Sequence, residues 1–533
     1  MNDLLQQDFG LIADVIRAHA HATPAARALV EGQRTLTYAE LDALMDRTAA
    51  ALQRDGVLAG EAVAICAGAS IDYAVVFLGA LRAGIAVAPL APGSTADSLL
   101  RMAADAEAKL FFLDANVAAA LDEAGGGSGN DVDRAIQPAP PVPRIALDAS
   151  ATGRALDDWL APVGATPLRA DIQPTMPFNI IYSSGTTGEP KGIVQSHGMR
   201  WSHIKRGSLF SYGSDTVTVL ATPLYSNTTL VVFFPTLAFG GTVVLMPKFD
   251  AVGYLQIAQA CRATHTMLVP VQYQRIMARP EFDSFDLSTF LYKFSTSAPF
   301  SAAIKADVLK RWPGGLIEYY GMTEGGGTCI LLAHEHPDKL HTVGQPAVGA
   351  DMRLIDEDGQ ELPAHRAGQT AQIVGEIVGS SPGMMTGYHQ QAEKTREVEW
   401  FDATGKRFIR TGDVGRFDED GFLILMDRRK DMVISGGFNI YPSDLEAELR
   451  RHPDVADAAV IGVPSEQWGE TPVALVVLRP EASPAAADVM AWYNARAGKT
   501  QRLSALRFMD ELPRSAIGKV LKRQLREQFG GTS

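Results

Sequence analysis

The sequence predicts an α/β fold built on parallel sheets, with a smaller second unit at the carboxyl end. Short apolar runs alternate with amphipathic stretches through most of the first 400 residues, as they do where strands alternate with helices. A chain of 533 residues is too long for one ordinary hydrophobic core, so two or more domains are expected. The charged connector 427–431 precedes a compact stretch, and we place the boundary at Asp427, giving domains 1–426 and 427–533.

Local patterns predict the individual elements. Thr37 and Glu40 have the spacing of a capping box, which predicts a helix that runs to about Asp55. The apolar run 230–247 has membrane-like length, but Pro235 and two glycines interrupt it, so a core helix followed by a buried strand is expected. The remaining expectations are strands at 62–65, 111–113, 178–181, 267–269 and 316–319, a surface loop at 124–143, and, in the second unit, elements at 445–451, 455–463, 473–478 and 485–495.

Composition limits the classes of partner. The apolar content of 46% and charged content of 20% are those of a soluble globular protein. A net charge of −13 argues against nucleic acid or an anionic membrane as the main partner. Cys66, Cys261 and Cys329 are far apart and odd in number, which favours a reducing compartment. The start of the chain carries Asp3 and Asp8 and shows no signal-peptide pattern, so a cytoplasmic protein is expected.

A loop rich in glycine and hydroxyl side chains follows the apolar run 178–181. Residues 182–192 read Tyr-Ser-Ser-Gly-Thr-Thr-Gly-Glu-Pro-Lys-Gly. Glycines let backbone N–H groups approach an anion closely, hydroxyls add donors, and lysine adds a positive charge. The spacing is not G-x-x-x-x-G-K-[ST], so a P-loop NTPase is disfavoured. We therefore predict a phosphate-binding loop, with a flexible Ser/Gly/Thr linker as the alternative.

Four further segments follow this loop along the chain, and together with it they span most of the sequence. They are Tyr-Gly-Met-Thr-Glu at 320–324, Arg-Thr-Gly-Asp at 410–413, Asp-Arg-Arg-Lys-Asp at 427–431 and Pro-Arg-Ser-Ala-Ile-Gly-Lys at 513–519. With them the chain resembles the adenylate-forming enzymes: acyl-CoA synthetases, aryl-CoA ligases, firefly luciferase and the adenylation domains of peptide synthetases. The resemblance implies a large N-terminal domain of parallel-sheet α/β layers with a β-barrel-like subdomain, and a small mobile α+β C-terminal domain.

The resemblance also implies two half-reactions. A carboxylate attacks the α-phosphate of ATP to give an acyl-adenylate and pyrophosphate, and a thiol, usually that of coenzyme A, then displaces AMP. Donors and cations fixed in advance favour the first step because two anions must meet. The resemblance assigns the phosphates to Ser183, Ser184, Gly185, Thr186, Thr187, Gly188 and Lys191, and adenine and ribose to Ser297, Ala298, Pro299, Tyr320, Gly321, Met322, Asp413 and Arg428.

Three residues receive catalytic roles from the same resemblance. Glu324 holds Mg²⁺, which favours carboxylate oxygen, and Thr323 contacts the α-phosphate. Lys519 bridges the carboxylate and the α-phosphate, so it is expected to carry adenylation. The alternatives are a solvated turn glutamate and an ordinary lysine of a basic tail.

The C-terminal domain is expected to swing between the two half-reactions. The thiol needs the side of the carbonyl that the domain of Lys519 would crowd, so the chain must rotate about Asp427. Gly436, Gly437 and Phe438 are then expected beside the pantetheine of coenzyme A, where only backbone fits.

The acyl pocket is less well specified by sequence. By resemblance it includes His197, Tyr225, Ser226, Asn227, Gly325 and Gly326. Ser226 stands where many relatives have histidine or an aromatic residue, with Tyr225 as a substitute gate, and the glycines after Glu324 are expected to create space. Helix capping is an alternative role for His197. Because the lining segments contain no Arg or Lys, we expect a monocarboxylic acid with an apolar tail, fatty or aryl.

Four functions remain open at this point. The first is an acyl-CoA ligase that uses ATP, Mg²⁺ and coenzyme A. The second loads a carrier-protein thiol, the third is a luciferase-like oxygenase, and the fourth is an inactive nucleotide-binding protein. The first is favoured because no carrier domain follows Gly530 and because Glu324, Asp413 and Lys519 are all present. The expected partners are small molecules. We expect no nucleic acid partner and no stable membrane insertion, and a homodimer is compatible with the sequence.

Overall fold

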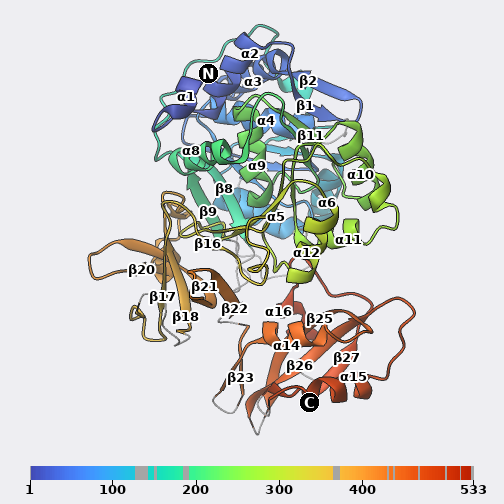
Figure 1. Cartoon of the computed structure of the whole chain (residues 1–533). Coiled ribbons are helices and arrows are strands. Elements are labelled where there is room, and N and C mark those ends of the chain that lie inside the picture. Colours follow the sequence, from blue (N-terminus) through green and yellow to red (C-terminus); the bar gives the residue numbers. More distant parts are fainter. Residues whose placement is uncertain are drawn as a thin grey trace.

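Two large mixed sheets form the body of the molecule (Figure 1). The structure is a computed structural model that describes residues 2–126, 142–148, 153–183, 191–363, 373–428, 431–435, 438–465, 468–498, 501–515 and 518–529. The first sheet has nine strands in the order β16-β15-β14-β13-β12-β10-β11-β1-β2. These are β1 Arg27–Glu31, β2 Arg34–Thr37, β10 Val217–Leu220, β11 Thr242–Leu245, β12 His265–Leu268, β13 Tyr292–Ser295, β14 Gly315–Tyr320, β15 Cys329–Leu332 and β16 Gln345–Pro346.

The second sheet has eight strands in the order β19-β9-β8-β4-β3-β5-β6-β7. Its members are β3 Ala62–Cys66, β4 Ala86–Pro89, β5 Phe111–Leu113, β6 Arg144–Ala146, β7 Arg154–Ala155, β8 Pro177–Ser183, β9 Lys191–Ser196 and β19 Gly387–Tyr388. In both sheets the central strands are parallel and antiparallel pairs lie toward the edges. This arrangement confirms the predicted α/β class.

Helices cover the sheets and fill the space between them. The largest apolar cluster joins residues of both sheets to helices α4 and α9, which have buried residues along almost their whole length. Such a layered core is the normal solution for sheets with two buried faces. The helices of the body are α1 Asn2–Gln6, α2 Ile12–Ala22, α3 Tyr38–Arg54, α4 Ile71–Arg82, α5 Ala96–Asp105, α6 Ala115–Gly126, α7 Leu156–Trp159, α8 His197–Lys205, η1 Arg206–Phe210, α9 Asn227–Ala238, α10 Ala251–Ala260, α11 Pro270–Met277, η2 Phe282–Ser284 and α12 Ala302–Arg311.

Two smaller sheets follow along the chain. The third, mostly antiparallel, is the barrel-like part, with β17 Asp351–Ile355, β18 Gly375–Ser380, β20 Glu399–Phe401, β21 Arg407–Phe417 and β22 Leu423–Arg428, and helix α13 Ala392–Val398 lies beside it. The fourth holds β23 Val433–Ser435, β24 Phe438–Ile440, β25 Val455–Ser465, β26 Gly469–Leu478 and β27 Ala505–Phe508, with helices α14 Pro442–Leu449, α15 Ala486–Asn494 and α16 Lys522–Phe529. In Figure 1 the fourth sheet and its helices, in orange and red, form a separate lobe.

Most of the local predictions agree with these elements. Thr37 caps α3, and a reciprocal bond from its backbone N–H to Glu40 completes the capping box. The strand predicted at 267–269 begins two residues earlier, at His265. Helix α9 runs through Pro235 to Ala238 and the buried strand β11 begins at Thr242, so the predicted core helix followed by a buried strand is confirmed.

Two further expectations concern membrane insertion and disulfide bonds. No helix in the described part of the chain is both long and apolar enough to cross a bilayer. All three cysteines are unpaired. The loop predicted at 124–143 lies largely outside the described residues, although α6 extends into its first positions.

Candidate active site

Three neighbouring parallel strands end at one edge of the nine-stranded sheet. Strands β12, β13 and β14 pair in parallel, so the segments that leave their carboxyl ends, 269–271, 296–299 and 321–325, lie at the same edge. In α/β sheets, ligands bind at the carboxyl ends of the strands. The motif 320–324 and the Ser-Ala-Pro segment 297–299 are therefore brought together by the sheet itself.

Tyr320 and Asp413 form the first contact of the site. The hydroxyl of Tyr320 donates a hydrogen bond of 2.8 Å to Oδ2 of Asp413. Burial, followed by the charge of Asp413, raises the pKa of Tyr320, so the phenol stays protonated and remains a donor. The backbone of Arg428 pairs with that of Asp413 across strands β21 and β22. The structure thus places together three residues that the sequence assigned to adenine and ribose.

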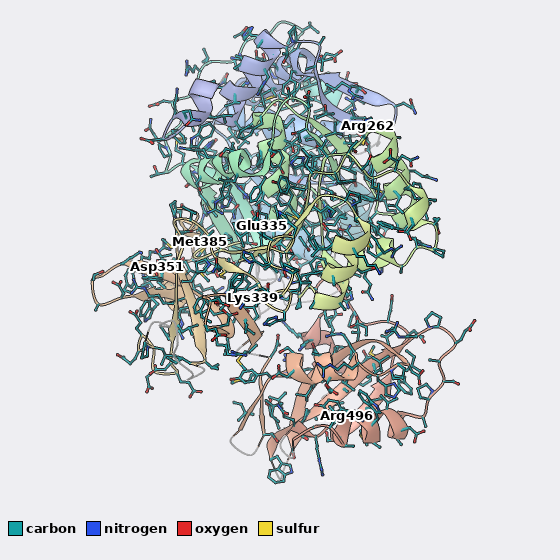
Figure 2. All side chains as sticks on the ribbon, in the orientation of Figure 1. Arg262, Glu335, Lys339, Asp351, Met385 and Arg496 are labelled. Carbon is teal, nitrogen blue, oxygen red and sulfur yellow. The ribbon has the colours of Figure 1, made fainter. Side chains whose placement is uncertain are left out.

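Glu324 and Lys191 meet at a tyrosine that the sequence analysis did not identify. The hydroxyl of Tyr388 donates a hydrogen bond of 2.9 Å to Oε1 of Glu324. Nζ of Lys191, at the end of the predicted phosphate loop, lies 5.1 Å from the centre of the Tyr388 ring. The backbone N–H of Met385 also binds the carbonyl of Glu324, at 2.8 Å. Figure 2 shows Met385 where the body meets the third sheet.

The donor set of this region fits Mg²⁺. Among the described residues, no group of three or more His, Cys, Asp or Glu side chains is placed to hold a metal ion. Magnesium usually takes one or two protein carboxylates together with substrate phosphate oxygens. The single carboxylate of Glu324, fixed by Tyr388, matches that pattern, so Glu324 would hold the ion and the ion would neutralise charge on the phosphates.

The Lys519 loop of the C-terminal lobe reaches the same edge of the sheet. Gly518 has φ +77, and a Cβ built on it would lie 2.8 Å from Cγ1 of Val271 and 3.5 Å from Cγ2 of Val269. Val269 and Val271 lie at the start of α11, directly after β12. The loop is held by hydrogen bonds from the N–H of Gly518 to the carbonyl of Ser515 and from the N–H of Lys519 to the hydroxyl of Ser515. Glycine at 518 therefore allows this turn to dock beside the site.

Other cations of the basic tail bind within the C-terminal lobe. Lys522 pairs with Glu446 at 2.7 Å, Arg526 with Asp431 at 2.6 Å, and Arg523 with Glu527 at 2.7 Å. Helix α16, which carries these residues, lies on the side of the lobe that faces the body (Figure 1). Contacts within the lobe explain the positions of these three cations, but they do not explain why residue 518 contacts the body.

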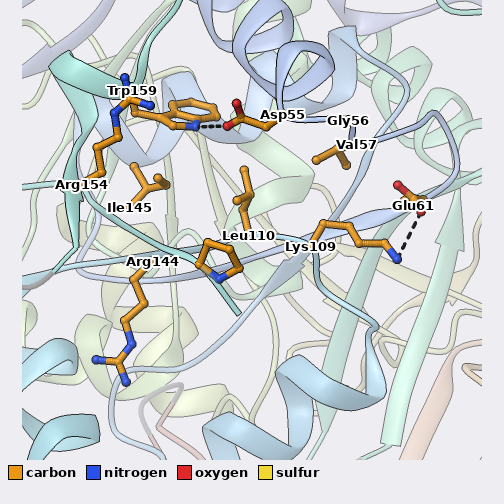
Figure 3. A pocket seen from close by; sticks show the side chains of 11 residues that line it. Asp55, Gly56, Val57, Glu61, Lys109, Leu110, Arg144, Ile145, Arg154 and Trp159 are labelled. Atoms are coloured by element: carbon orange, nitrogen blue, oxygen red, sulfur yellow. Dashed lines mark hydrogen bonds and ion pairs between the residues drawn. The ribbon is translucent and has the colours of Figure 1, made fainter. Parts of the chain in front are cut away.

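A pocket of about 520 Å³ lies away from this edge (Figure 3). It lies over β5, β6 and the end of α3, and none of its lining residues belongs to the five motifs. Its charged groups are paired locally, for example Lys109 with Glu61 and the indole N–H of Trp159 with Asp55. This pocket is not the site that the motifs predict.

Comparison with known proteins agrees with the motifs. The model of the AMP-binding enzyme family matches residues 16–389, and that of its C-terminal domain matches residues 444–519. The chain belongs to the AMP-binding enzyme family. It is 33% identical over 525 residues to a feruloyl-CoA synthase of Amycolatopsis, covering 96% of this chain and 97% of the relative. It is 30% identical to the fatty acid–[acyl-carrier-protein] ligase ScoC of Streptomyces coeruleorubidus, over 97% and 96% of the two chains.

Solved structures share the whole architecture. ATP-bound MatB from Rhodopseudomonas palustris has a TM-score of 0.83 and 30% identity, covering 97% of this chain and 99% of that one. The fold class, family and reaction type predicted from the sequence are therefore confirmed. The chain is an AMP-forming acyl-CoA synthetase that uses ATP and coenzyme A.

The acyl segments of this AMP-binding enzyme contain a partly buried pair of hydroxyls. Oγ of Ser297 and Oγ1 of Thr228 are 2.5 Å apart, and Ser297 has a φ of +82, which is rare for a residue other than glycine. The hydroxyl of Ser226 accepts from the N–H of Thr228 and caps α9. The side chain of Ser226 thus has a structural partner, and Tyr225, whose pKa burial raises, is partly buried next to it.

His197 is not a helix cap, so that alternative is wrong. The cap of α8 is Ser196, whose hydroxyl accepts from the N–H of Met199, and His197 is the first helical residue. The imidazole is buried with its centre 5.0 Å from the ring of Phe178, and its Nε2 has no hydrogen-bond partner. Burial lowers the pKa of His197 to about 4. Its place in the acyl pocket stays a prediction.

The glycines after Glu324 do not create open space, contrary to the expectation. A Cβ on Gly325 would lie 1.8 Å from the carbonyl oxygen of Gly383, and one on Gly327 would lie 1.5 Å from the sulfur of Met352. Gly325 and Gly326 also have φ values of +74 and +84. These residues instead allow the turn after β14 to pack closely against the third sheet.

Several assigned residues lie outside the described part of the chain. These are Ser184, Gly185, Thr186, Thr187, Gly188, Gly436 and Gly437. For Ser183, Asp427, Arg428 and Phe438 only the backbone is described, in β8, β22, β22 and β24 respectively. Their roles stay predictions.

Proposed function

We propose that this synthetase activates a monocarboxylic acid with an apolar tail and transfers it to free coenzyme A. The observation that supports the proposal is the docking of Gly518, and with it the Lys519 turn, at the edge where Tyr320, Asp413 and Glu324 gather. In this orientation the lysine is delivered from one lobe to a nucleotide site built by the other. A cation placed there stabilises the approach of a carboxylate to the α-phosphate.

The same arrangement gives each residue a role in adenylation. Asp413, held by Tyr320, accepts the ribose hydroxyls, and Glu324, held by Tyr388, takes the metal ion on the phosphates. Lys191 and the loop 183–188 bind the β- and γ-phosphates. The C-terminal lobe, residues 427–533, then turns about Asp427 so that the thiol can reach the acyl-adenylate. We place the protein in the cytoplasm, and a homodimer is compatible with this scheme.

Exchange of labelled pyrophosphate into ATP tests the proposal. Wild-type protein should exchange pyrophosphate in the presence of hexanoate or benzoate, and Lys519→Ala should lose at least about 100-fold of this rate because a preorganised charge is removed. Arg523→Ala is the matched control, since Arg523 is an exposed cation four residues beyond the motif and pairs with Glu527 within its own helix. Equal loss in both variants, or no exchange with any acid, would contradict the proposal.

A carrier-protein thiol is the second candidate acceptor. It is favoured by the 30% identity to ScoC, whose name describes a fatty acid–carrier-protein ligase. Thioester formation measured with coenzyme A and with a phosphopantetheinylated carrier protein at equal concentration separates the two. The proposal predicts faster transfer to coenzyme A.

A further inference from the structure

A buried arginine without an ionic partner lies behind the Thr323–Glu324 turn. Arg200, on α8, is 1% exposed, and none of the described residues forms an ion pair with it. Within the described part of the chain its Nη1 has no hydrogen-bond partner, and its guanidinium carbon is 6.0 Å from the centre of the Phe178 ring. A charge buried in this way is costly unless the surroundings compensate it. The sequence analysis gave Arg200 no role.

Two neutral amides bind the guanidinium. Nε of Arg200 donates to Oδ1 of Asn179 at 2.9 Å, and Nη2 donates to Oε1 of Gln195 over a very short distance. Asn179 and Gln195 are fully buried and face each other across strands β8 and β9, and Nδ2 of Asn179 also donates to Oε1 of Gln195, at 2.9 Å. Both donors therefore occupy the oxygen of the Gln195 amide, which fixes the orientation of that amide.

The fixed amide points its nitrogen at the active site. Nε2 of Gln195 donates a hydrogen bond of 2.7 Å to the backbone carbonyl of Thr323. The next peptide is held on the other side, because the N–H of Met385 donates to the carbonyl of Glu324. The turn that carries the proposed α-phosphate and metal ligands is thus held by Gln195 of β9 on one side and by the segment that precedes β19 on the other.

We propose that Arg200 and Gln195 form a positioning network that sets the orientation of Thr323 and Glu324 for MgATP. The network touches no substrate. Arg200 locks Gln195, Gln195 holds the Thr323 carbonyl, and the turn then presents its hydroxyl and carboxylate in the geometry that MgATP requires. A displacement of about 1 Å at such a turn is enough to lower the rate of reaction by about 100-fold. This inference rests on the roles proposed above for Thr323 and Glu324.

A matched pair of variants isolates the hydrogen bond to Thr323. Gln195→Glu and Asn179→Asp each add one carboxylate next to Arg200, so both compensate the buried charge. Only Gln195→Glu replaces the donor that faces the Thr323 carbonyl with an acceptor. In pyrophosphate exchange, we expect Gln195→Glu to raise KM for MgATP at least tenfold and to shift the Mg²⁺ concentration for half-maximal rate upward. Asn179→Asp removes the Nδ2 donor but leaves Nη2 of Arg200 on the Gln195 oxygen, so it should change both by less than twofold.

Thr236→Val controls for the loss of a buried hydrogen bond. The hydroxyl of Thr236 bonds Thr218 and the carbonyl of Val232, each at 2.7 Å, at the end of α9 that lies away from the acyl segments. This variant should lower Tm without raising KM for MgATP. KM for the acid should stay within twofold in all three variants.

Each outcome decides the proposal. Equal KM values for MgATP in Gln195→Glu and wild type would overturn it, as would a tenfold rise in Asn179→Asp, which would assign the effect to the charge of Arg200 itself. If Gln195→Glu does not fold, Gln195→Met, which keeps the length of the side chain, replaces it under the same criteria. Wild-type exchange in the same assay separates a failure of this network from a failure of the proposed function.

Discussion

The hydroxyl of Tyr388 offers a direct test of how the metal ligand is held. Tyr388→Phe removes one atom, the oxygen that donates to Oε1 of Glu324 at 2.9 Å. The ring remains, so the contact with Lys191 at 5.1 Å is kept. Burial and the neighbouring carboxylate of Glu324 raise the pKa of Tyr388, so the hydroxyl is a donor throughout the working pH range.

The expected size of the effect follows from the charge on the acceptor. A hydrogen bond to a charged group contributes about 1.5–3 kcal/mol, and about 1.4 kcal/mol corresponds to a factor of ten. Glu324 is partly exposed, so water replaces some of the lost interaction and the lower end applies. We expect kcat/KM for MgATP in pyrophosphate exchange to fall about tenfold in Tyr388→Phe.

A second tyrosine provides the control. The hydroxyl of Tyr38 donates to the carbonyls of Leu237 and Gly241, remote from the motifs, so Tyr38→Phe should lower Tm but leave kcat/KM for MgATP unchanged. A change of less than twofold in kcat/KM for MgATP would show that Tyr388 does not hold the metal ligand. A change in KM for coenzyme A by the same factor as the change for MgATP would show the same.

Three further outcomes follow from the same structure. Burial lowers the pKa of His197 and His265 to about 4 in the folded state, against 6.5 when unfolded. Unfolding therefore takes up protons below about pH 6.5. The free energy of unfolding should be at its full value above about pH 6.5 and fall by about 3 kcal/mol per histidine toward pH 4. Urea unfolding measures it, and a free energy that does not change across this window would contradict the expectation. Gly325→Ala places a methyl group against Gly383 at a φ of +74, so Tm should drop by several degrees or the protein should misfold. Gly405→Ala is the control and should lower Tm less, because Gly405 has φ +82 but lies at an open turn. Asp427→Pro should spare adenylate formation and slow thioester formation from supplied acyl-adenylate, and equal loss of both steps would argue against rotation about this residue.

The choice of acid is tested by a panel of substrates. AMP release with hexanoate or benzoate should exceed that with malonate, because the acyl segments carry no cation to pair with a second carboxylate. A preference for malonate would refute the apolar tail. It would also direct attention to Arg206, a largely buried cation beside Tyr319, next to the start of the 320–324 motif.

The elements that could be predicted from sequence are those set by short-range patterns. The capping box of Thr37 and Glu40 locates the start of α3 because both bonds form within one turn. Pro235 is accommodated inside α9 because the missing N–H costs a single hydrogen bond, and burial of apolar side chains on both flanks of the proline keeps the helix continuous.

The nucleotide residues could be predicted because each lies in a contiguous motif. Their partners could not. Tyr388 is 64 residues from Glu324 in the sequence, and Gln195 is 128 residues from Thr323, the residues to which they hydrogen-bond. Neither has a local pattern that distinguishes it from an ordinary strand residue. The prediction for the glycines at 325 and 327 failed for the same reason, since the atoms that exclude a side chain there belong to Gly383 and Met352, which are distant in sequence.

The interactions of the C-terminal lobe are arranged so that it can leave the site as one body. Its ion pairs Arg514–Asp457, Lys522–Glu446 and Arg526–Asp431 all join residues that follow the proposed boundary. The contact of Gly518 with Val271, in contrast, crosses the boundary, and it is small and apolar. Apolar contact contributes only about 25 cal/mol per Å² of buried area, so withdrawing this turn costs little, whereas a docking held by ion pairs would have to break them in every cycle. A small apolar contact of this kind fits the withdrawal of the lobe that we propose between the two half-reactions.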